Sequence, residues 1–76
     1  MESMRCKVFI HSLSHAYNNG VEIDFRPVMG GTEENLSFHA ATPGGSFKVT
    51  LSKEASERLG AFTLGKEYYV DFCAAY

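Results

Sequence analysis

Short runs of alternating apolar and polar residues recur along this chain, separated by turn residues at intervals of about 8–12 positions. The cleanest run places Val21, Ile23 and Phe25 at every second position, with charged residues between them. The preceding dipeptide Asn19-Gly20 is typical of a tight hairpin turn, because both residues tolerate a positive φ angle. A period of two residues is that of a strand with one buried face, so the sequence predicts a mainly β domain.

The alternating runs predict five antiparallel strands, at residues 5–13, 21–26, 35–42, 47–51 and 67–73. One short helix is expected before the last strand, with Ser52 as its N-cap, Gly60 as its terminator and Phe62 docking it onto the sheet. Leu13 and Asp24 are expected on faces turned away from the core. The residues expected to face inward are Cys6, Val8, Ile10, Val21, Ile23, Phe25, Leu36, Phe38, Ala40, Phe47, Val49, Leu51, Tyr68, Val70 and Phe72.

The 76 residues allow a single domain, taken as residues 1–76, in which residues 1–3 are either a frayed end or a vector remnant. A chain of this length cannot cover both faces of an open sheet, so the sheet must curl on itself or pair with a second copy. Curling predicts a small five-stranded antiparallel barrel or sandwich of the OB or SH3-like kind. Pairing through exposed edges predicts a homo-oligomer.

Cys6 and Cys73 lie near opposite ends of the chain, on the first and last predicted strands. We expect two reduced, buried thiols on neighbouring strands, because the N-terminus carries no recognisable secretory h-region. A disulfide between the two is the alternative. Either state places the ends of the chain side by side.

Composition and motifs disfavour several classes of function. Seven basic and nine acidic residues give a formal net charge of −2, which argues against strong non-specific binding of nucleic acid. No apolar run approaches the roughly 20 residues of a membrane helix, so we expect no membrane contact. The GxSxG, Walker-type and paired-carboxylate patterns are missing, so we expect no enzyme activity. His11 and His15 are spaced as on a helix but fall on a predicted strand, so neither a metal site nor a cofactor is expected.

A Gly-Gly loop at residues 29–35 is the most distinctive local feature. Its backbone N–H groups can form an anion-binding nest, but Glu33 and Glu34 would repel a phosphate there. A plain hairpin connection is the alternative. If the loop binds a partner, we expect Glu33 and Glu34 to receive a basic protein surface.

A second Gly-rich loop, at residues 42–45, has no acidic neighbours. Its backbone amides, with Thr42 beside them and Lys48 as counter-charge, are candidates to hold a phosphate or a nucleotide, and a simple β-turn is the alternative. Tyr68 and Tyr69 are adjacent on a strand and must point to opposite sides. The outward Tyr69 is therefore a candidate ligand-binding residue or a contact between subunits.

Several segments of the chain resemble a group of small bacteriophage proteins of unassigned function. The matching segments are MRCK at residues 4–7, EENLSF at 33–38, TPGG at 42–45 and GKEYYVDF at 65–72, whereas residues 11–20 match nothing recognisable. The resemblance implies a phage origin and a location in the host cytoplasm. Since the group has no established activity, it implies no catalytic residue.

These observations favour a non-enzymatic phage accessory protein that acts by binding, as an oligomer, either to a host factor or to a small nucleotide signal in counter-defence. Thr42, Lys48 and Tyr69 are the residues expected to bind a nucleotide, and Glu33 and Glu34 a basic protein. The first alternative is an OB-like protein that binds single-stranded nucleic acid in phage replication. The second is a minor virion or assembly protein.

Overall fold

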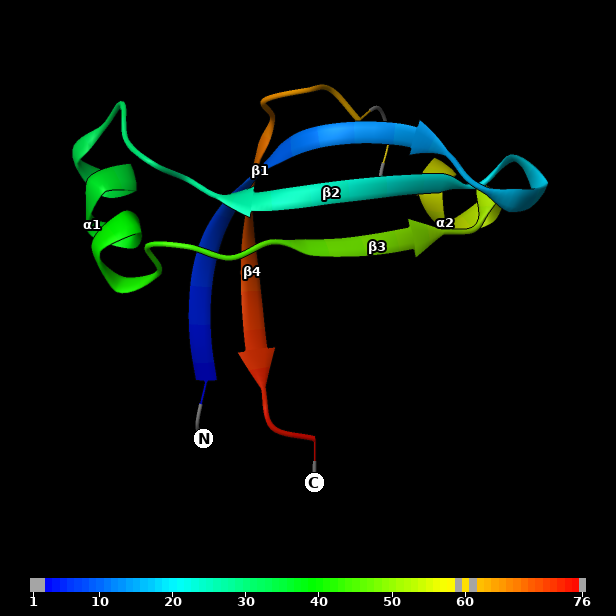
Figure 1. The fold of residues 1–76 in the computed structure, drawn as a ribbon. Helices are drawn as coiled ribbons and strands as arrows, with labels where there is room; N and C mark the ends of the chain where they lie inside the picture. Colours follow the sequence, from blue (N-terminus) through cyan, green and yellow to red (C-terminus); the bar gives the residue numbers. More distant parts are fainter. Residues whose placement is uncertain (1–2, 59, 61, 76) are drawn as a thin grey trace.

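A curled four-stranded antiparallel sheet forms the body of the molecule in the computed structural model, which describes residues 3–58, 60 and 62–75 (Figure 1). The strands lie side by side in the order β3-β2-β1-β4. The mainly β prediction is confirmed, but the described residues contain four strands rather than five. In chain order the elements are β1 (Ser3–His15), the 3-10 turn η1 (Tyr17–Asn19), β2 (Val21–Pro27), α1 (Glu33–Ala41), β3 (Phe47–Leu51), α2 (Lys53–Arg58) and β4 (Glu67–Cys73).

The 13-residue strand β1 organises the fold because different parts of it pair with different neighbours. Its residues from Val8 onward pair with β2, whereas its residues from Ser3 to Phe9 pair with β4. The strand curves between these two parts, so that the sheet bends round into half of a barrel (Figure 1). The beginning of β1 and the end of β4 consequently lie side by side at one end of the body, with Ser3 opposite Cys73.

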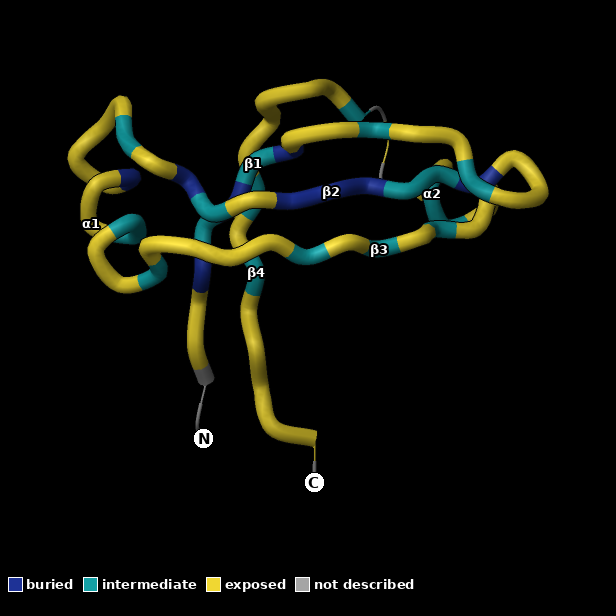
Figure 2. The backbone as a smooth tube through the Cα atoms, in the orientation of Figure 1, coloured by how far each residue is buried: buried dark blue, intermediate teal, exposed yellow. Residues whose placement is uncertain are grey.

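The core lies on the concave side of the sheet. Val8, Ile10, Ile23 and Phe25 form the buried cluster at its centre, and Figure 2 shows the buried residues concentrated in the middle of β1 and β2. All four were predicted to face inward. Partly buried side chains from β3, β4 and Phe62 pack around this cluster, so the prediction that Phe62 packs against the sheet is confirmed.

A β-bulge in β1 overturns one of the predicted faces. The pairing of β1 with β2 shifts between Ile10 and Ser12, which leaves one extra residue in β1. Beyond the shift Leu13 lies opposite Ile23 and packs against the core. Leu13 was expected on the other side because an unbroken period of two places residues 10 and 13 on opposite faces.

The segment 35–42 was predicted as a strand, but residues 35–41 form most of helix α1 and Thr42 is its C-cap. Thr32 is the N-cap, and its hydroxyl accepts a hydrogen bond of 3.0 Å from the backbone N–H of Asn35. Glu33 and Glu34 occupy the first turn, where the helix dipole favours negative charge. The predicted inward position of Leu36 is also wrong, because this side chain is 58% exposed.

The first hairpin is confirmed, although its glycine serves a different purpose from the one expected. Asn18 and Asn19 adopt positive φ angles of 55° and 61°, while Gly20 has a φ of −75°. A Cβ atom on Gly20 would lie 2.5 Å from the backbone oxygen of Leu51. Close approach of β3, rather than backbone conformation, therefore requires glycine here.

The structure agrees more closely with the prediction in the segment after α1. β3 and β4 have the predicted bounds, and the hydroxyl of Ser52 caps α2 by accepting a 3.1 Å hydrogen bond from the N–H of Ala55. Gly60 has a φ of 80°, as expected of a helix terminator. Leu59, expected beside Ala55 on the helix, lies outside the described residues. Within the described residues, no helix has the length and apolar character needed to cross a membrane.

The terminal strands carry the remaining differences. Cys6 and Cys73 lie on neighbouring strands and carry free thiols, but only Cys6 is buried. Cys73 is exposed and Phe72 is 51% exposed, at the end of β4 that extends beyond β2 and β3. Ser3 begins β1 opposite Cys73, whereas Met1 and Glu2 fall outside the described residues. Asp24, expected in solvent, is 7% exposed.

Candidate functional site

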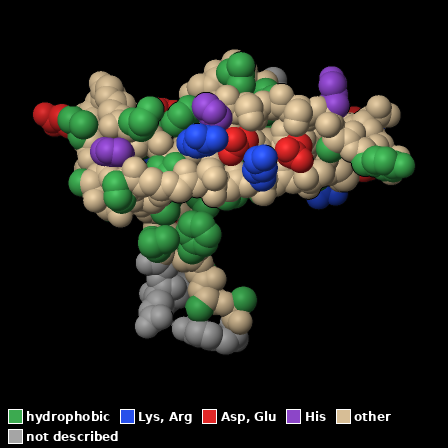
Figure 3. All heavy atoms as spheres, in the orientation of Figure 1, with side chains coloured by type: hydrophobic (Ala, Val, Ile, Leu, Met, Phe, Trp, Pro, Cys, Tyr) green, Lys and Arg blue, Asp and Glu red, His purple; other side chains and the backbone are tan. Residues whose placement is uncertain are grey.

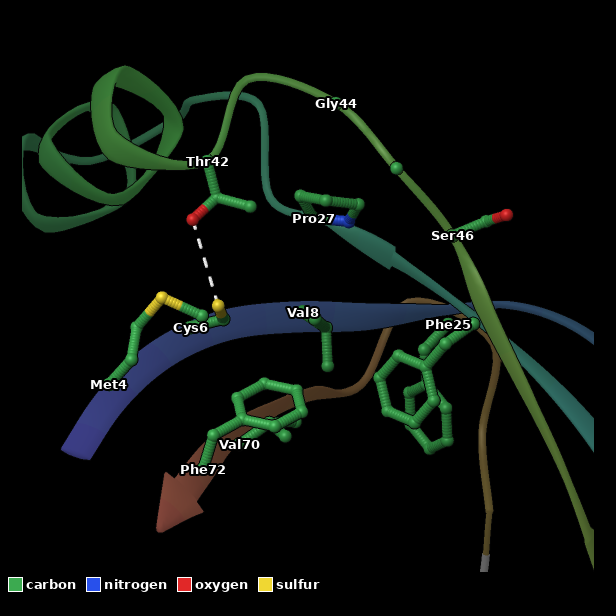
Figure 4. A pocket seen from close by; sticks show the side chains of 12 residues that line it. Met4, Cys6, Val8, Phe25, Pro27, Thr42, Gly44, Ser46, Val70 and Phe72 are labelled. Carbon is green, nitrogen blue, oxygen red and sulfur yellow. Dashed lines mark hydrogen bonds between the residues drawn. The ribbon is translucent and has the colours of Figure 1, made fainter. Parts of the chain in front are cut away.

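An apolar groove of about 300 Å³ opens on the concave side of the sheet, next to the core (Figure 4). The loop from Thr42 to Ser46 forms its polar rim. None of the described residues that line it is charged. Its apolar lining comes from all four strands and consists of Met4, Cys6, Val8, Phe25, Pro27, Phe47, Val70 and Phe72.

The groove exists because β2 is longer than the strand beside it. β3 pairs with β2 only as far as Phe25, where it meets Phe47, so Arg26 and Pro27 continue past the end of β3. The loop that joins α1 to β3 passes this unpaired end, as Figure 4 shows. Gly44 and Gly45 have no side chains with which to fill the space, so the groove stays open at this point.

The rings of Phe25 and Phe47 line the groove where it meets the core, and the ring of Tyr68 packs against Phe25 without lining the groove. The ring of Phe25 stacks on that of Phe47, with centroids 5.0 Å apart and an interplanar angle of 19°. Tyr68 meets Phe25 edge to face, with centroids 5.8 Å apart and an angle of 90°. Both arrangements are favoured by aromatic quadrupoles, so the rings of Phe25 and Phe47 are preorganised to receive an apolar group.

The polar groups of the rim are partly satisfied within the chain. The Thr42 hydroxyl points toward the Cys6 thiol, with the oxygen and sulfur 3.6 Å apart (Figure 4). Thr42 is also the C-cap of α1, and its N–H donates to the carbonyl of Phe38 at 2.8 Å. The groove therefore presents mainly apolar surface, the type of lining that binds apolar groups of a ligand or a protein.

On the convex side of β1 and β4, a polar cluster attaches α1 to the sheet. Lys7 Nζ donates to Glu34 Oε2 at 2.5 Å, and Tyr69 Oη donates to the same oxygen at 2.7 Å. The hydrogen bond from Lys7, and to a smaller extent that from Tyr69, lowers the pKa of Glu34 below its usual range. The same contacts with Glu34 raise the pKa values of Lys7 and Tyr69. Each group is thus held in the protonation state that supports the contact.

Two further contacts extend this cluster along the strands. Arg5 donates to both carboxylate oxygens of Asp71, at 2.7 and 3.1 Å, which raises the pKa of Arg5 and lowers that of Asp71. The buried amide of Asn35 donates to the Gly30 carbonyl at 3.1 Å and to Glu67 Oε2 at 2.9 Å. Within the described residues, the charges of this cluster are paired with one another, as expected of a structural attachment.

The structure places the two glutamates expected to bind a basic partner in the first turn of α1. Glu34 already receives the cation of Lys7 from its own chain. Glu33 is exposed beside it. A basic protein would have to compete with Lys7 for Glu34.

The three residues expected to bind a nucleotide do not meet in the structure. Thr42 lines the groove, whereas Tyr69 contacts α1 on the opposite face of the sheet. Lys48 lies on β3, exposed and opposite Asp24 in register. β3 and β4 form the two edges of the sheet, so Lys48 and Tyr69 are separated by two intervening strands.

Figure 3 shows a face on which Lys, Arg, Asp and Glu side chains alternate over β2 and β3, without a continuous basic stripe. Arg26 Nη2 lies 3.4 Å from Asp24 Oδ2, so even this cation has an acidic neighbour. A strip of mixed charge is typical of a solvated surface. This face does not provide the basic track that single-strand binders use.

Sequence reasoning missed Met4, Cys6 and Phe72 as members of a surface site. The alternation did contain a signal for them, since Met4 is in phase with Cys6 and Phe72 is in phase with Val70. What it could not provide was the length by which β1 and β4 extend beyond the other strands. Comparison with known proteins adds no guide, because no family model, no curated protein and no solved structure matches this chain.

Proposed function

We propose that this chain is a non-enzymatic binding protein whose groove is a surface for protein–protein interaction. The observation that carries the proposal is the uncharged apolar lining of the groove, in which Met4 and Phe72 are about half exposed. Large side chains of this kind at an open, preorganised surface are characteristic of the centres of protein interfaces. The groove is thus the part of the molecule best suited to binding.

Of the two ligands considered for such a protein, a protein partner fits the groove better than a nucleotide. Phosphate groups require cations or aligned N–H donors, and none of the described groove residues carries a charge. An apolar side chain or segment requires only the surface that is present. The resemblance to small phage proteins supports an accessory role in the host cytoplasm, directed at a host factor.

The barrel expected of an OB or SH3-like domain is compatible with this proposal. A half-barrel of four strands leaves its concave side open, and contact with another protein, or with a second copy, would complete the enclosure. Binding and oligomerisation are then two uses of the same surface. A minor virion or assembly role would use it in the same way.

Binding of single-stranded nucleic acid is the second candidate, and one observation favours it. Tyr69 is 51% exposed, with the Arg5 guanidinium 5.1 Å and the Lys7 ammonium 5.5 Å from its ring centroid. An exposed aromatic ring between two cations can stack a base. Asp71 and Glu34 pair with these cations, however, and weaken their attraction for phosphate. Binding by this surface should fall steeply with salt, whereas binding in the groove should respond little.

The test of the proposed function uses the purified protein incubated in a bacterial host lysate and then analysed by native mass spectrometry. Thr42→Arg places a charge at the groove, and Leu64→Asp places one on an exposed apolar residue that does not line it. We expect an identified host protein to be retained by the unmodified chain and by Leu64→Asp, and lost with Thr42→Arg. Retention that is the same for all three variants contradicts the proposal, and so does a result in which none of them retains either a host protein or a second copy.

A further inference from the structure

The ends of β1 and β4 form a two-stranded arm that lacks the support of the rest of the sheet. Among the described residues, the backbone of Ser3–Cys6 pairs only with that of Val70–Cys73, because β2 begins to pair with β1 at Val8. Four residues per strand give the arm a length of about 13 Å. A two-stranded ribbon is at best marginally stable on its own in water. Contact with another surface would therefore stabilise the arm.

The two faces of the arm differ sharply in polarity. Met4 pairs with Phe72 and Cys6 pairs with Val70 on the concave side, which bears no charge. On the other side Arg5 and Asp71 form their two hydrogen bonds. Only the concave side of the arm therefore exposes an apolar surface that another protein could bury. This surface is continuous with the rest of the groove (Figure 4).

The accessible surface area of the chain indicates how much area a partner should bury. The accessible surface is 5615 Å², whereas a compact protein of 8.4 kDa exposes roughly 4,600 Å². The excess of about 1,000 Å² is close to the ~800 Å² that each partner contributes to a standard interface. The radius of gyration, 13.6 Å, likewise exceeds the ~11.4 Å expected for 76 residues.

We infer that two copies of this chain form a symmetric dimer in which the arm of each lies in the groove of the other. This inference rests on the proposed function and names the partner at the same site. A two-fold axis makes both contacts identical. Because the arm residues Met4 and Phe72 also line the groove of their own chain, one continuous apolar surface per chain makes both contacts. Met4 and Phe72 of one copy then pack beside the rim at Thr42 of the other, and the Arg5–Asp71 face remains in water.

A second copy suits the groove because the arm has the chemistry that the groove accepts. Both surfaces are apolar and uncharged, so neither leaves a buried charge unpaired when they meet. The match in area also favours one partner of this size over a short peptide. The concave side of each half-barrel is closed in the same contact.

The first experiment measures the mass of the full chain in solution by light scattering on a size-exclusion column over a concentration series. We expect twice 8.4 kDa for the unmodified protein. Phe72→Asp should weaken the dimer by at least ~30-fold, because it places a carboxylate in a buried apolar contact. The control Leu64→Asp changes an exposed apolar residue outside the groove and should remain dimeric. Circular dichroism checks that each variant is folded.

Mixing two variants tests whether the arm and groove contacts are reciprocal. Thr42→Arg alone should be monomeric, because the groove then carries a bulky cation. An equimolar mixture of Phe72→Asp and Thr42→Arg should recover a dimer weaker than that of the unmodified chain. The carboxylate of one chain then meets the guanidinium of the other, whereas Phe72→Asp also alters the groove of its own chain. If the two copies instead associated by pairing the edges of their sheets, mixing the two variants would not restore a dimer.

A monomer at 100 µM, or a dimer that Phe72→Asp does not weaken, overturns the inference. So does a failure of the mixture to re-form a dimer when both variants are folded. The proposed function is judged separately by the lysate experiment. A monomeric chain whose groove still retains a host protein, with Thr42→Arg abolishing retention, keeps the proposed function and rejects the dimer.

Discussion

Met4 and Phe72 face each other across β1 and β4, and they remain 56% and 51% exposed although both line the groove. This cross-strand pair is where the apolar interior of the half-barrel reaches the surface. It distinguishes two parts of the concave side: a packed core, in which substitutions should affect folding, and an open end, in which they should affect binding.

Phe25→Ala should lower the free energy of unfolding by about 3–5 kcal/mol, because it removes a ring that is 9% exposed and contacts both Phe47 and Tyr68. Phe72→Ala should cost the dilute monomer no more than about 1 kcal/mol, since half of its side chain is in water. Urea unfolding at low protein concentration measures both values. Equal losses for the two variants would show that the division between core and open end is wrong.

Gly20→Ala should destabilise the fold by about 1–3 kcal/mol, because the new Cβ would lie 2.5 Å from the Leu51 carbonyl oxygen. The control is Gly44→Ala, where a Cβ meets nothing within 4 Å. This variant should be neutral or slightly more stable. Thermal melting of both proteins provides the comparison, and a stable Gly20→Ala would mean that β3 does not approach the hairpin as closely as described.

Asn35→Ala should lower the free energy of unfolding by about 1–3 kcal/mol, since it leaves the Gly30 carbonyl and Glu67 without the buried amide donor. Leu36→Ala, which alters an exposed neighbour on the same helix, should change stability much less. Hydrogen exchange should show faster exchange in α1 for Asn35→Ala while the amides of β2 remain protected. Unaltered exchange in α1 would exclude Asn35 as its attachment.

Acid should weaken the attachment of α1 through Glu34. The hydrogen bonds from Lys7 and Tyr69 lower the pKa of Glu34 in the folded protein, so their stabilisation is complete above the unfolded value of about 4.3 and is lost as the pH falls through the lowered pKa. Glu34→Gln should therefore melt below the unmodified protein at pH 7, and the gap should narrow below pH 4. Glu33→Gln is the matched control. A gap of constant size from pH 7 to pH 3 would exclude this contribution.

Sequence reasoning succeeded where a single periodicity controls the structure. β2 alternates without interruption, and its inward residues Val21, Ile23 and Phe25 were identified from the period of two alone. β4 has the predicted bounds for the same reason. The period failed in β1, because the bulge between Ile10 and Ser12 is defined by pairing with β2, which the sequence of one strand does not reveal.

The error at α1 arose from competition between two local patterns. Leu36 and Phe38 alternate with polar residues as in a strand, whereas Thr32 followed by two glutamates is a helix N-terminus. The segment forms a helix rather than a strand. This helix meets the sheet through polar contacts and buries no apolar stripe, so the apolar alternation did not determine its structure. The groove could not be predicted, since it depends on the unequal lengths of β2 and β3 and on the arm formed by distant segments.

The most direct test of the groove as the interaction surface is a dilution series of ¹⁵N-labelled protein followed by amide NMR. From 1 mM to 10 µM, we expect concentration-dependent shifts confined to the arm, residues 3–6 and 70–73, and to the groove rim at 42–46. The amides of α1 around Glu34 should not move. Spectra of a monomer at every concentration, or shifts centred on α1 and the convex face, would contradict the assignment of the groove as the surface through which two copies of this protein associate.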